Sequence, residues 1–591
     1  MPATCRNPPR PPATRPRHAA TRRLRGPPGA RVAAKRVATG RELADRPGGQ
    51  GCCVTLPNVS EAPESGPAGG GRRWLVWLAP TLLTLVVTLA GIGHAQLWRD
   101  ELATWSAATR PVRDLVRLAG TIDAATGPYY LFMHGWTALF GTSPTALRLP
   151  SALAMAAAAG LTARLGERLA GIRGGLLAGL LFAVLPGTSR YGQEARPYAL
   201  ATLLAVLATL LLVDALRRPT WRRWTGYAAV AAALGLTHLI AVALLVAHGL
   251  VVLLASWRGL PATGLARPEN SGGPATGDEP TTSGEPADDH EPAARGGPVA
   301  GRAAAGDRHA RWGLLRRWLA AMLPVVLLVA PLVLVARGQR SRQLNWVHLA
   351  DLSDLAALPG GVAQSGVVGG LLVGLAALGA ARLGRRALLP GAAVLLPVLL
   401  LLAAGTRVPI WVNRYLVFTV PFACLLAGAA LAGVRLAPAL AVVTLAGLLG
   451  LPDQAALRRT HEWPRTAPVD YAGAARVIAE HEQPGDGIVY SPRRSWLFLD
   501  LGMAYHLGAH RPRDVLVVRD QRERADLWAG ECDRPAECLA GVPRVWLVVS
   551  GRHPDPLSAV SGAKGTALRD SFTVRQVWPR PGLTVALLTR R

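Results

Sequence analysis

Lysine is almost missing from this 591-residue sequence: of its 65 basic residues, all but Lys35 and Lys564 are arginine. This bias is typical of a bacterial genome rich in G and C. The sequence also lacks a basic stripe with interleaved aromatic residues, which argues against nucleic acid as a partner. Between residue 453 and the end, no glycine-rich phosphate loop occurs.

Cysteine is scarce as well. The six cysteines lie at positions 5, 52, 53, 424, 532 and 538 and show none of the repeated spacing of a metal site. Only Cys532 and Cys538 are placed for a disulfide. The sequence leaves open whether they form one or remain free thiols, because bacterial domains outside the cell use disulfides variably.

Hydrophobic residues, in contrast, are abundant. They make up 50% of the chain and mean hydropathy is +0.25, yet the formal net charge is +28. A soluble domain rarely combines these values, whereas a membrane protein with arginine-rich inner loops does. We therefore expect an α-helical, polytopic membrane protein.

Apolar runs long enough to be membrane spans follow one another along the chain. Arginines cluster at alternate ends of these runs, so the positive-inside rule places the N-terminus in the cytoplasm and the C-terminal segment outside a bacterial plasma membrane. The division at Thr237 and His238 rests on a tight turn between a short helix and a longer one. We predict eleven spans: 74–95, 147–169, 172–189, 198–216, 225–237, 239–257, 316–336, 366–382, 387–404, 415–434 and 436–452.

Three further regions frame these spans. Residues 1–73 are rich in Pro, Gly, Ala and Arg without periodicity and are predicted to be a disordered basic cytoplasmic tail. Within the transmembrane domain, 74–452, residues 258–312 have the composition of a disordered cytoplasmic linker. Residues 453–591 alternate helix and strand signals, which indicates a small extracytoplasmic α/β domain. Its predicted elements are a helix at 471–480, strands at 487–491, 514–518 and 544–550, and a final hairpin through 579–582.

The first outer loop, 96–146, begins with two carboxylates. Its apolar residues recur at helical spacing, so we expect short helices that wall a cavity. Asp100 and Glu101 follow directly on the first span, where a carboxylate can accept the proton of an attacking hydroxyl. The structural alternative is that Asp100 caps the helix that follows.

A second polar cluster, residues 190–198, lies in the next outer turn. If Glu194 faces Asp100 across a cavity, the two carboxylates can share a cation or divide the work of catalysis. The alternative is a structural ion pair between Glu194 and Arg190 or Arg196.

Other polar residues are weaker candidates for substrate binding. Arg414 opposes the positive-inside tendency and could hold a phosphate bidentately, although it could also extend toward lipid headgroups. His134 and His238 could equally be packed or capping residues. Trp98 and Trp105 are typical of an aromatic belt. The complete predicted set is Tyr129, His134, Arg196, Tyr198, His238 and Arg414.

Several of these residues lie in motifs that together resemble a known superfamily. The motifs are LWRDELATWS, GPYYLFMHGWTALFG, ALRLPSALA, RYGQEARPYALATLLAVLATLLL and NRYLVFTVPF. Their order and spacing, from about Trp74 to Leu451, resemble the GT-C membrane glycosyltransferases. The most similar groups are the bacterial protein O-mannosyltransferase and aminoarabinose-transferase-like enzymes of glycosyltransferase family 39.

The resemblance implies transfer of a sugar, mannose or similar, from a polyprenyl-phosphate carrier to a protein, lipid or glycan acceptor on the outer face, with inversion. It implies that Asp100 is the base or a metal ligand, with Glu101 as its companion and Glu194 as the second outer-loop acid. Arg196 and Arg414 would contact the phosphate. A divalent metal ion, held by Asp100 and Glu194, is the one cofactor expected.

Two other classes compete with this hypothesis. A transporter or lipid flippase usually places ionisable groups near the middle of the bilayer, whereas these predicted spans are nearly uncharged at their centres. A non-catalytic membrane scaffold that displays the outer domain would not depend on Asp100 or Glu194.

Overall fold

A computed structural model of the chain describes residues 74–258, 299–462 and 467–591. These residues fall within one unit, Gly69–Arg591. The predicted tail, 1–73, and most of the predicted linker, 258–312, lie outside the described residues.

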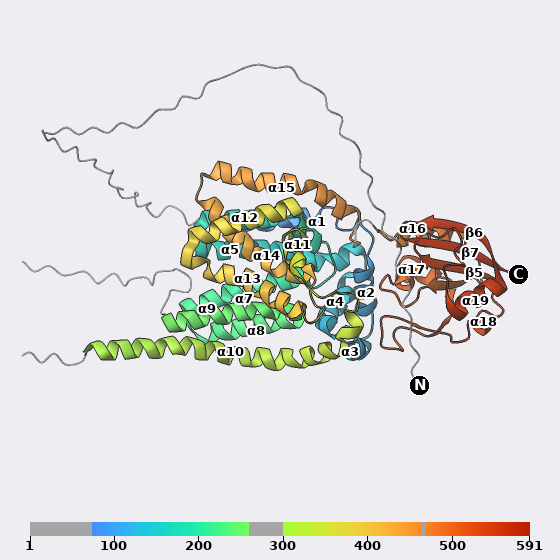
Figure 1. Ribbon diagram of the computed structural model, residues 1–591, viewed down its shortest axis with the longest axis horizontal. Coiled ribbons are helices and arrows are strands. Elements are labelled where there is room, and N and C mark those ends of the chain that lie inside the picture. The colour runs from blue at the N-terminus through green and yellow to red at the C-terminus, as the bar shows by residue number, and fades with distance from the viewer. Residues whose placement is uncertain (1–73, 259–298, 463–466) are drawn as a thin grey trace, which may run out of the picture. The chain divides into compact units, whose positions relative to one another are not determined.

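Each of the eleven predicted spans coincides with helix (Figure 1). The long helix α5 covers two of them, and its backbone departs from helical geometry at Gly171. The helices are α1 Leu75–Leu89, α5 Pro144–Val184, α7 Tyr198–Arg217, α8 Trp221–Thr237, α9 Ala243–Arg258, α10 Val299–Gln343, α12 Gly366–Leu383, α13 Leu388–Gly405, α14 Val420–Ala432 and α15 Leu436–Arg459.

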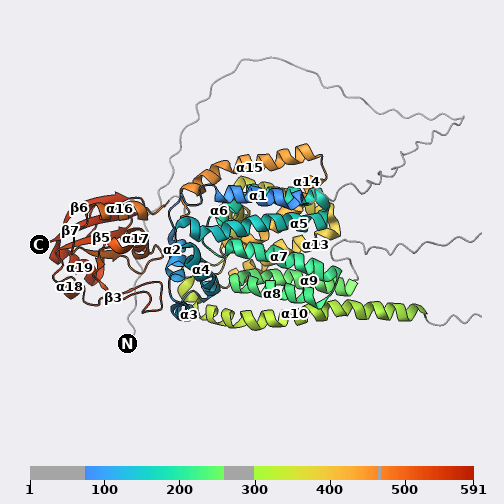
Figure 2. The ribbon, with the colours of Figure 1, turned by 180° about the vertical axis from the view of Figure 1, so that it is seen from behind.

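Seven helical stretches of the described chain are long and apolar enough to cross a membrane. Two of them, Pro144–Val184 and Gly366–Gly405, are 41 and 40 residues long. Since one crossing needs about 20 residues, each of these two stretches has the length of two crossings. Figure 2 shows α7, α8, α9 and α10 side by side, and the same helices contact one another in pairs.

The structure differs from the predicted boundaries at several places. Helix α10 begins at Val299, inside the predicted linker, because residues 299–312 are rich in alanine, the strongest helix former, and contain no proline. Helix α15 continues through Pro452 to Arg459. Two short helices were not predicted separately: α6 Pro186–Gly192, which follows the extended residue Leu185, and α11 Leu352–Ala363, which Asp351 caps.

The first outer loop folds into short helices, as predicted. They are α2 Arg99–Ala108, α3 Val112–Thr121, η2 Ala124–Thr126 and α4 Gly127–Phe140. Buried apolar residues at helical spacing, such as Leu115 and Leu118 on α3, hold these helices together. Asp100 does not cap α2: Trp98 occupies the cap position and Asp100 lies in the first turn, where the helix dipole favours acidic residues.

The C-terminal domain is a five-stranded sheet in the order β2-β1-β5-β7-β6, with helices on both faces (Figure 1). Strands β1, β2 and β5 run parallel, and β7 is antiparallel to β5 and β6. The central strand β5 is buried from Val545 to Val549, as a strand covered on both faces requires. The helices are α16 Tyr471–His481, α17 Leu499–Leu507, α18 Pro535–Cys538 and α19 Gly562–Ser571, and the strands are β1 Gly487–Ser491, β2 Arg513–Asp514, β3 Val517–Arg519, β4 Gly530–Glu531, β5 Arg544–Ser550, β6 Phe572–Arg580 and β7 Leu583–Arg590.

One strand prediction in this domain is wrong. Residues 514–518 do not form a single strand, because the chain leaves the main sheet after Asp514 and pairs with β4 from Val517 onward. Arg493 fixes this change of partner by donating two hydrogen bonds to Asp514 at 2.6 and 2.7 Å. Cys532 and Cys538 form a disulfide, the alternative that the sequence left open.

Direct contacts join the C-terminal domain to the short outer helices. Gln96 donates to the carbonyl of Val469 and accepts from the amide of Ala472. Tyr505 donates to the carbonyl of Thr142 at 3.0 Å, and one apolar cluster contains residues from α2, α4 and α17. Residues 460–462, which follow α15, also contact this region: Arg190 on α6 donates to the carbonyl of His461, and Arg99 on α2 lies 3.8 Å from Glu462.

Candidate functional site

A cavity of about 200 Å³ lies where the short outer helices meet α6, α11 and the segment after α15. Its wall combines acidic residues, arginines, histidines and tryptophans with apolar residues. The lining residues are Trp98, Arg190, Tyr191, Glu194, Trp346, Val347, His348, Asp354, Gly361, Gln364, Trp411, Val412, Asn413, Arg414, Leu457, His461 and Glu462.

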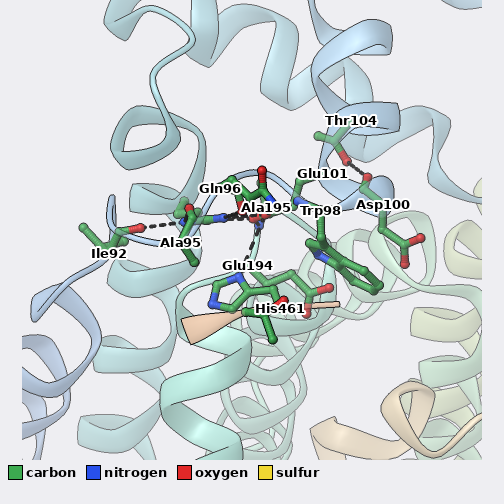
Figure 3. A network of polar contacts seen from close by, with 12 residues as sticks. Ile92, Ala95, Gln96, Trp98, Asp100, Glu101, Thr104, Glu194, Ala195 and His461 are labelled. Carbon is green, nitrogen blue, oxygen red and sulfur yellow. Dashed lines mark hydrogen bonds and ion pairs between the residues drawn. The ribbon is translucent and has the colours of Figure 1, made fainter. Parts of the chain in front are cut away.

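Trp98 is central to this wall. Its indole is almost fully buried, and three guanidinium groups lie within 6 Å of its ring centre: Arg190 at 5.2 Å, Arg99 at 5.9 Å and Arg414 at 5.9 Å. These are cation–π distances, so the ring favours a concentration of positive charge around it. The prediction that Trp98 is an aromatic-belt anchor is therefore wrong, because this side chain, drawn in Figure 3, is only 2% exposed and lines the cavity.

Glu101, next to Asp100 in sequence, has a different environment. Arg148 donates to both of its carboxylate oxygens, at 2.8 and 2.6 Å, and uses its remaining N–H groups on the carbonyls of Ile92, Ala95 and Gln96. The amide of Ala195 donates to Glu101 at 2.9 Å. Burial alone would raise the pKa of this carboxyl, but the charge and hydrogen bonds of Arg148 hold it well below its usual range. These contacts favour a structural role for Glu101, and its predicted part in catalysis stays a prediction.

Asp100 and Arg414 form a looser pair, in which Arg414 lines the cavity and Asp100 lies next to it without being a lining residue. The Asp100 Oδ2 and Arg414 Nη2 atoms lie 3.5 Å apart, and both side chains remain 19% exposed. Neither Asp100 Oδ2 nor Arg414 Nε has a hydrogen-bond partner among the described residues. The pair therefore keeps hydrogen-bonding capacity for a ligand.

For the second polar cluster, the predicted ion pair and the predicted position of Glu194 at a cavity are both present. Glu194 Oε2 lies 2.9 Å from Arg190 Nη1, so the predicted ion pair is present, and both residues also line the cavity. The angle between these atoms is not that of a hydrogen bond, and neither has another partner in the described part of the chain. Burial raises the pKa of Glu194, and the charge of Arg190 opposes this shift. The charge of Asp100 adds to it, so the two carboxylates interact electrostatically.

The segment after α15 contributes two residues that the sequence analysis missed. His461 and Glu462 are both buried in the cavity wall. Burial, aided by the charge of Arg190, lowers the pKa of His461 to about 3, so the ring is neutral at neutral pH and its 3.9 Å approach to Glu101 is not an ion pair. Only the position of these residues directly after the last apolar run could have marked them, since no motif contains them.

Several of the unpartnered buried polar atoms belong to residues that line this cavity. A buried polar atom without a hydrogen bond costs about 1–3 kcal/mol, so a folded protein avoids such atoms unless a ligand or water satisfies them. Within the described ranges, the atoms of this kind on lining residues are Trp98 Nε1, Arg190 Nη1, Glu194 Oε1 and Oε2, Arg414 Nε, His461 Nδ1 and Glu462 Oε1, and Asp100 Oδ2 lies next to Arg414.

Two predicted substrate-binding residues, Tyr198 and His238, join Arg414 at a crevice beside the cavity. The Tyr198 and His238 rings are 5.8 Å apart, and Tyr415 lies 5.5 Å from His238. The crevice is otherwise lined by Ala201, Val417 and Phe418, so it is mainly apolar and aromatic.

The other predicted substrate-binding residues do not line the cavity. Arg196 donates to the Tyr130 hydroxyl at 3.3 Å, and His134 Nδ1 lies 2.9 Å from the carbonyl of Ala108. Tyr129 is buried, and its hydroxyl has no hydrogen-bond partner among the residues described. The structure thus brings Glu194, Tyr198, His238 and Arg414 to the cavity or the crevice. Asp100 reaches the site only through Arg414, and Tyr129, His134 and Arg196 line neither space.

The residues at the cavity do not by themselves form a metal centre. In the described part of the chain, no three His, Cys, Asp or Glu side chains converge as metal ligands would. Arg414 and Arg190 lie against the two predicted ligands, Asp100 and Glu194, and already supply positive charge there. No step below uses a metal ion.

Part of the chain matches a family model. Residues 128–264 match the family described as dolichyl-phosphate-mannose-protein mannosyltransferase. This range covers α4 to α9 and includes Glu194, Arg196, Tyr198 and His238. No curated protein matches the sequence.

Solved structures match over most of the chain. One is ArnT from Cupriavidus metallidurans bound to undecaprenyl phosphate, which is 14% identical with a TM-score of 0.52, covering 88% of this chain and 98% of that one. The same protein in the apo state is 13% identical, with a TM-score of 0.52 and coverage of 87% and 97%. This likeness concerns the fold. With the family match, it confirms the GT-C fold class and the resemblance predicted from the motifs.

Proposed function

We propose that this protein transfers a sugar, mannose or similar, from a polyprenyl-phosphate carrier to an acceptor at the outer face of the membrane, with inversion at the anomeric carbon. The match of residues 128–264 to a mannosyltransferase family supports this proposal. So does the fold shared with ArnT, whose structure holds undecaprenyl phosphate. The observation that carries the proposal is the set of unpartnered charged atoms around one cavity.

The donor phosphate would bind at Arg414. This guanidinium lines both the cavity and the crevice, so a phosphate there can have its sugar in the cavity. The crevice along Tyr198, His238 and Phe418 is closed in this structure and would have to open for the isoprenoid to lie there. Arginine binds phosphate bidentately and keeps its charge at any physiological pH. Asp100, 3.5 Å away, fixes the orientation of this guanidinium.

The reaction would be an in-line displacement. The acceptor hydroxyl attacks the anomeric carbon, the bond from that carbon to the phosphate oxygen breaks with its electron pair, and the hydroxyl proton passes to a carboxylate. An oxocarbenium-like transition state is expected by analogy with glycoside cleavage. Arg414 and Arg190 would stabilise the charge that develops on the leaving phosphate, and Asp100 remains the predicted base or metal ligand.

The outer location of this site is part of the proposal. The positive-inside pattern places the C-terminal domain outside, and the Cys532–Cys538 disulfide supports this orientation because disulfides persist in oxidising compartments. We further propose that the membrane is a bacterial plasma membrane, because the arginine bias is typical of a bacterial genome. The acceptor, whether protein, lipid or glycan, is not specified by any contact described above.

A direct assay tests the proposal. Purified full-length protein is given polyprenyl-phosphate-mannose and, separately, polyprenyl-phosphate-aminoarabinose, with a threonine-rich peptide or an alkyl mannoside as acceptor probe. We expect release of free polyprenyl phosphate with at least one donor, and loss of that release in Asp100→Asn. Asp114→Asn is the matched control, since its carboxylate pairs with the exposed Arg117 on α3 and lies outside the cavity. Absence of release with every donor would favour a transporter or a scaffold.

A further inference from the structure

Glu462 is a buried carboxylate that belongs to no motif of the sequence. It lies three residues after α15 ends at Arg459, and its side chain is only 3% exposed. It lines the same cavity as Arg414 and Glu194. Its position in the chain differs from that of the other acids, because it comes from the segment between the helices and the C-terminal domain.

The protein satisfies only part of the Glu462 carboxylate, which accepts a hydrogen bond from the backbone N–H of Arg99. Its nearest cation is Arg99, whose Nε lies 3.8 Å from Oε2, beyond hydrogen-bond distance. Its Oε1 atom has no hydrogen-bond partner among the described residues. Asp486, which is similarly buried in the C-terminal domain, accepts hydrogen bonds from the indole N–H of Trp546 at 2.8 Å and from the backbone N–H of Gln483 at 3.0 Å. Asp486 is therefore satisfied by the protein, whereas Glu462 keeps an oxygen for a ligand.

Charged and titratable groups face Glu462 from each neighbouring element. They are Arg99 and Asp100 on α2, Arg190 on α6 and Tyr471 on α16. Burial raises the pKa of Glu462 to about 7, Arg99 and Arg190 oppose this shift, and the charge of Asp100 adds to it. A carboxylate in this range is partly ionised at neutral pH and can both take up and release a proton.

Asp100 is less free to do the same work. Its carboxylate is directed to Arg414, the residue that also lines the crevice, so it lies on the donor side of the site. Asp100 is not among the residues that line the cavity, whereas Glu462 is. Glu462 accepts a hydrogen bond from the backbone N–H of Arg99, and its Oε1 atom remains without a partner among the described residues.

On the basis of the proposed function, we propose that Glu462 is the catalytic base that receives the acceptor hydroxyl, while Asp100 serves the donor phosphate through Arg414. The acceptor O–H proton passes to Glu462 Oε1 as the acceptor oxygen bonds to the anomeric carbon. The bond from that carbon to the phosphate oxygen breaks, and its electron pair leaves with the polyprenyl phosphate. Glu462 then returns the proton to water.

The experiment compares three variants of the full chain: Glu462→Gln, Glu462→Asp and the matched control Glu480→Gln, which removes an exposed carboxylate on α16. Transfer is followed by release of polyprenyl phosphate in the assay above. Donor binding is measured separately, as the shift in melting temperature on adding polyprenyl-phosphate-mannose. A pH series completes the set.

In Glu462→Gln we expect kcat to fall by about 10²–10³, as for loss of a general base, with donor affinity changed less than about threefold. The rise of kcat/KM with pH near 7 should disappear in this variant, since no carboxyl at 462 then ionises. Glu462→Asp, which keeps the carboxylate but shortens it, should retain activity above Glu462→Gln, and Glu480→Gln should match the wild type.

Three results would overturn the inference. Wild-type kcat and pH profile in Glu462→Gln would exclude the base role. An equal loss of donor binding and of kcat would show a structural role only. If Glu462→Gln does not fold, a Glu462→Asp variant in which donor binding and kcat fall together would show the same. A wild-type protein that releases no polyprenyl phosphate would instead refute the proposed function itself, and the inference with it.

Discussion

Two acid–arginine pairs begin at neighbouring positions of α2, and their surroundings are opposite. Glu101 and Arg148 are fully buried, and every N–H group of the guanidinium is used. Asp100 and Arg414 are partly exposed at a cavity, 3.5 Å apart, with hydrogen-bonding capacity left over. The first arrangement holds the backbone of residues 92–101 against α5, and the second leaves charge available to a ligand.

The difference shows how burial decides what an ion pair does. Removal of two charges from water costs several kcal/mol each, and only excellent geometry with further hydrogen bonds offsets this cost. Arg148 and Glu101 meet this condition, as does Arg493, which bonds Asp514 and Glu531 in the C-terminal domain. The cavity pairs do not meet it, and residues that do not satisfy one another in the folded chain are candidates for binding substrate.

The largest expected effect is on stability, in the satisfied pair. Glu101→Gln leaves the charge of Arg148 buried without its counter-ion, so we expect the free energy of unfolding to fall by about 3–5 kcal/mol. Thermal unfolding of the purified protein measures this. Glu537→Gln is the control, because the Arg534–Glu537 pair is exposed on both sides and should affect the melting temperature little. A stable but inactive Glu101→Gln would instead restore the predicted catalytic role of Glu101.

The next effect is on activity, in the open pair. Arg414→Ala should lower kcat/KM for the lipid-linked donor by about 10²–10³, because a preorganised positive charge is lost where the phosphate leaves. Arg414→Lys should recover only part of this loss, since lysine cannot bind phosphate bidentately. Arg407→Ala, an exposed arginine in the preceding loop, should behave as the wild type. Unchanged donor kinetics in Arg414→Ala would contradict the phosphate site.

Chelation tests how the cavity obtains its positive charge. Arg190 and Arg414 already face the two predicted metal ligands, so we expect activity to change less than about twofold after dialysis against EDTA. Release of polyprenyl phosphate before and after dialysis is the measurement. A loss that Mg²⁺ or Mn²⁺ restores would assign Asp100 and Glu194 the metal role that the family resemblance implies.

The smallest effect is expected at His134. This ring lies 2.9 Å from the carbonyl of Ala108 and does not line the cavity, so His134→Gln should change kcat/KM by less than about twofold. The same steady-state assay checks this, with His238→Gln as the comparison, because His238 lines the crevice beside Arg414. A large loss in His134→Gln would mean that substrate reaches beyond the cavity described above.

Much of the fold was predictable because its signals are local. Apolar runs marked the helices that coincide with the eleven predicted spans, and the buried run Val545–Val549 marked the central strand of the C-terminal sheet. Boundaries were less predictable where other forces override hydropathy. Alanine propensity extends α10 back to Val299, and the bond from Arg493 to Asp514 divides a predicted strand in two.

The site was predictable only in part, for the same reason. Asp100, Glu194 and Arg414 stood out because charge at the end of an apolar run is costly and therefore conspicuous. Tyr129, His134 and Arg196 are close to them in sequence, yet they do not line the cavity, since the direction of a side chain depends on how the helices pack.

The sequence by itself determined the fold class and the positions of the apolar helices along the chain, because both depend on composition and spacing. Only the tertiary structure decided that Asp100 pairs with Arg414, 314 positions further along, and that Glu101 pairs with Arg148. It also decided that Glu462 lines the cavity beside Arg414. These contacts arise from packing between distant segments, and no local pattern of residues encodes them.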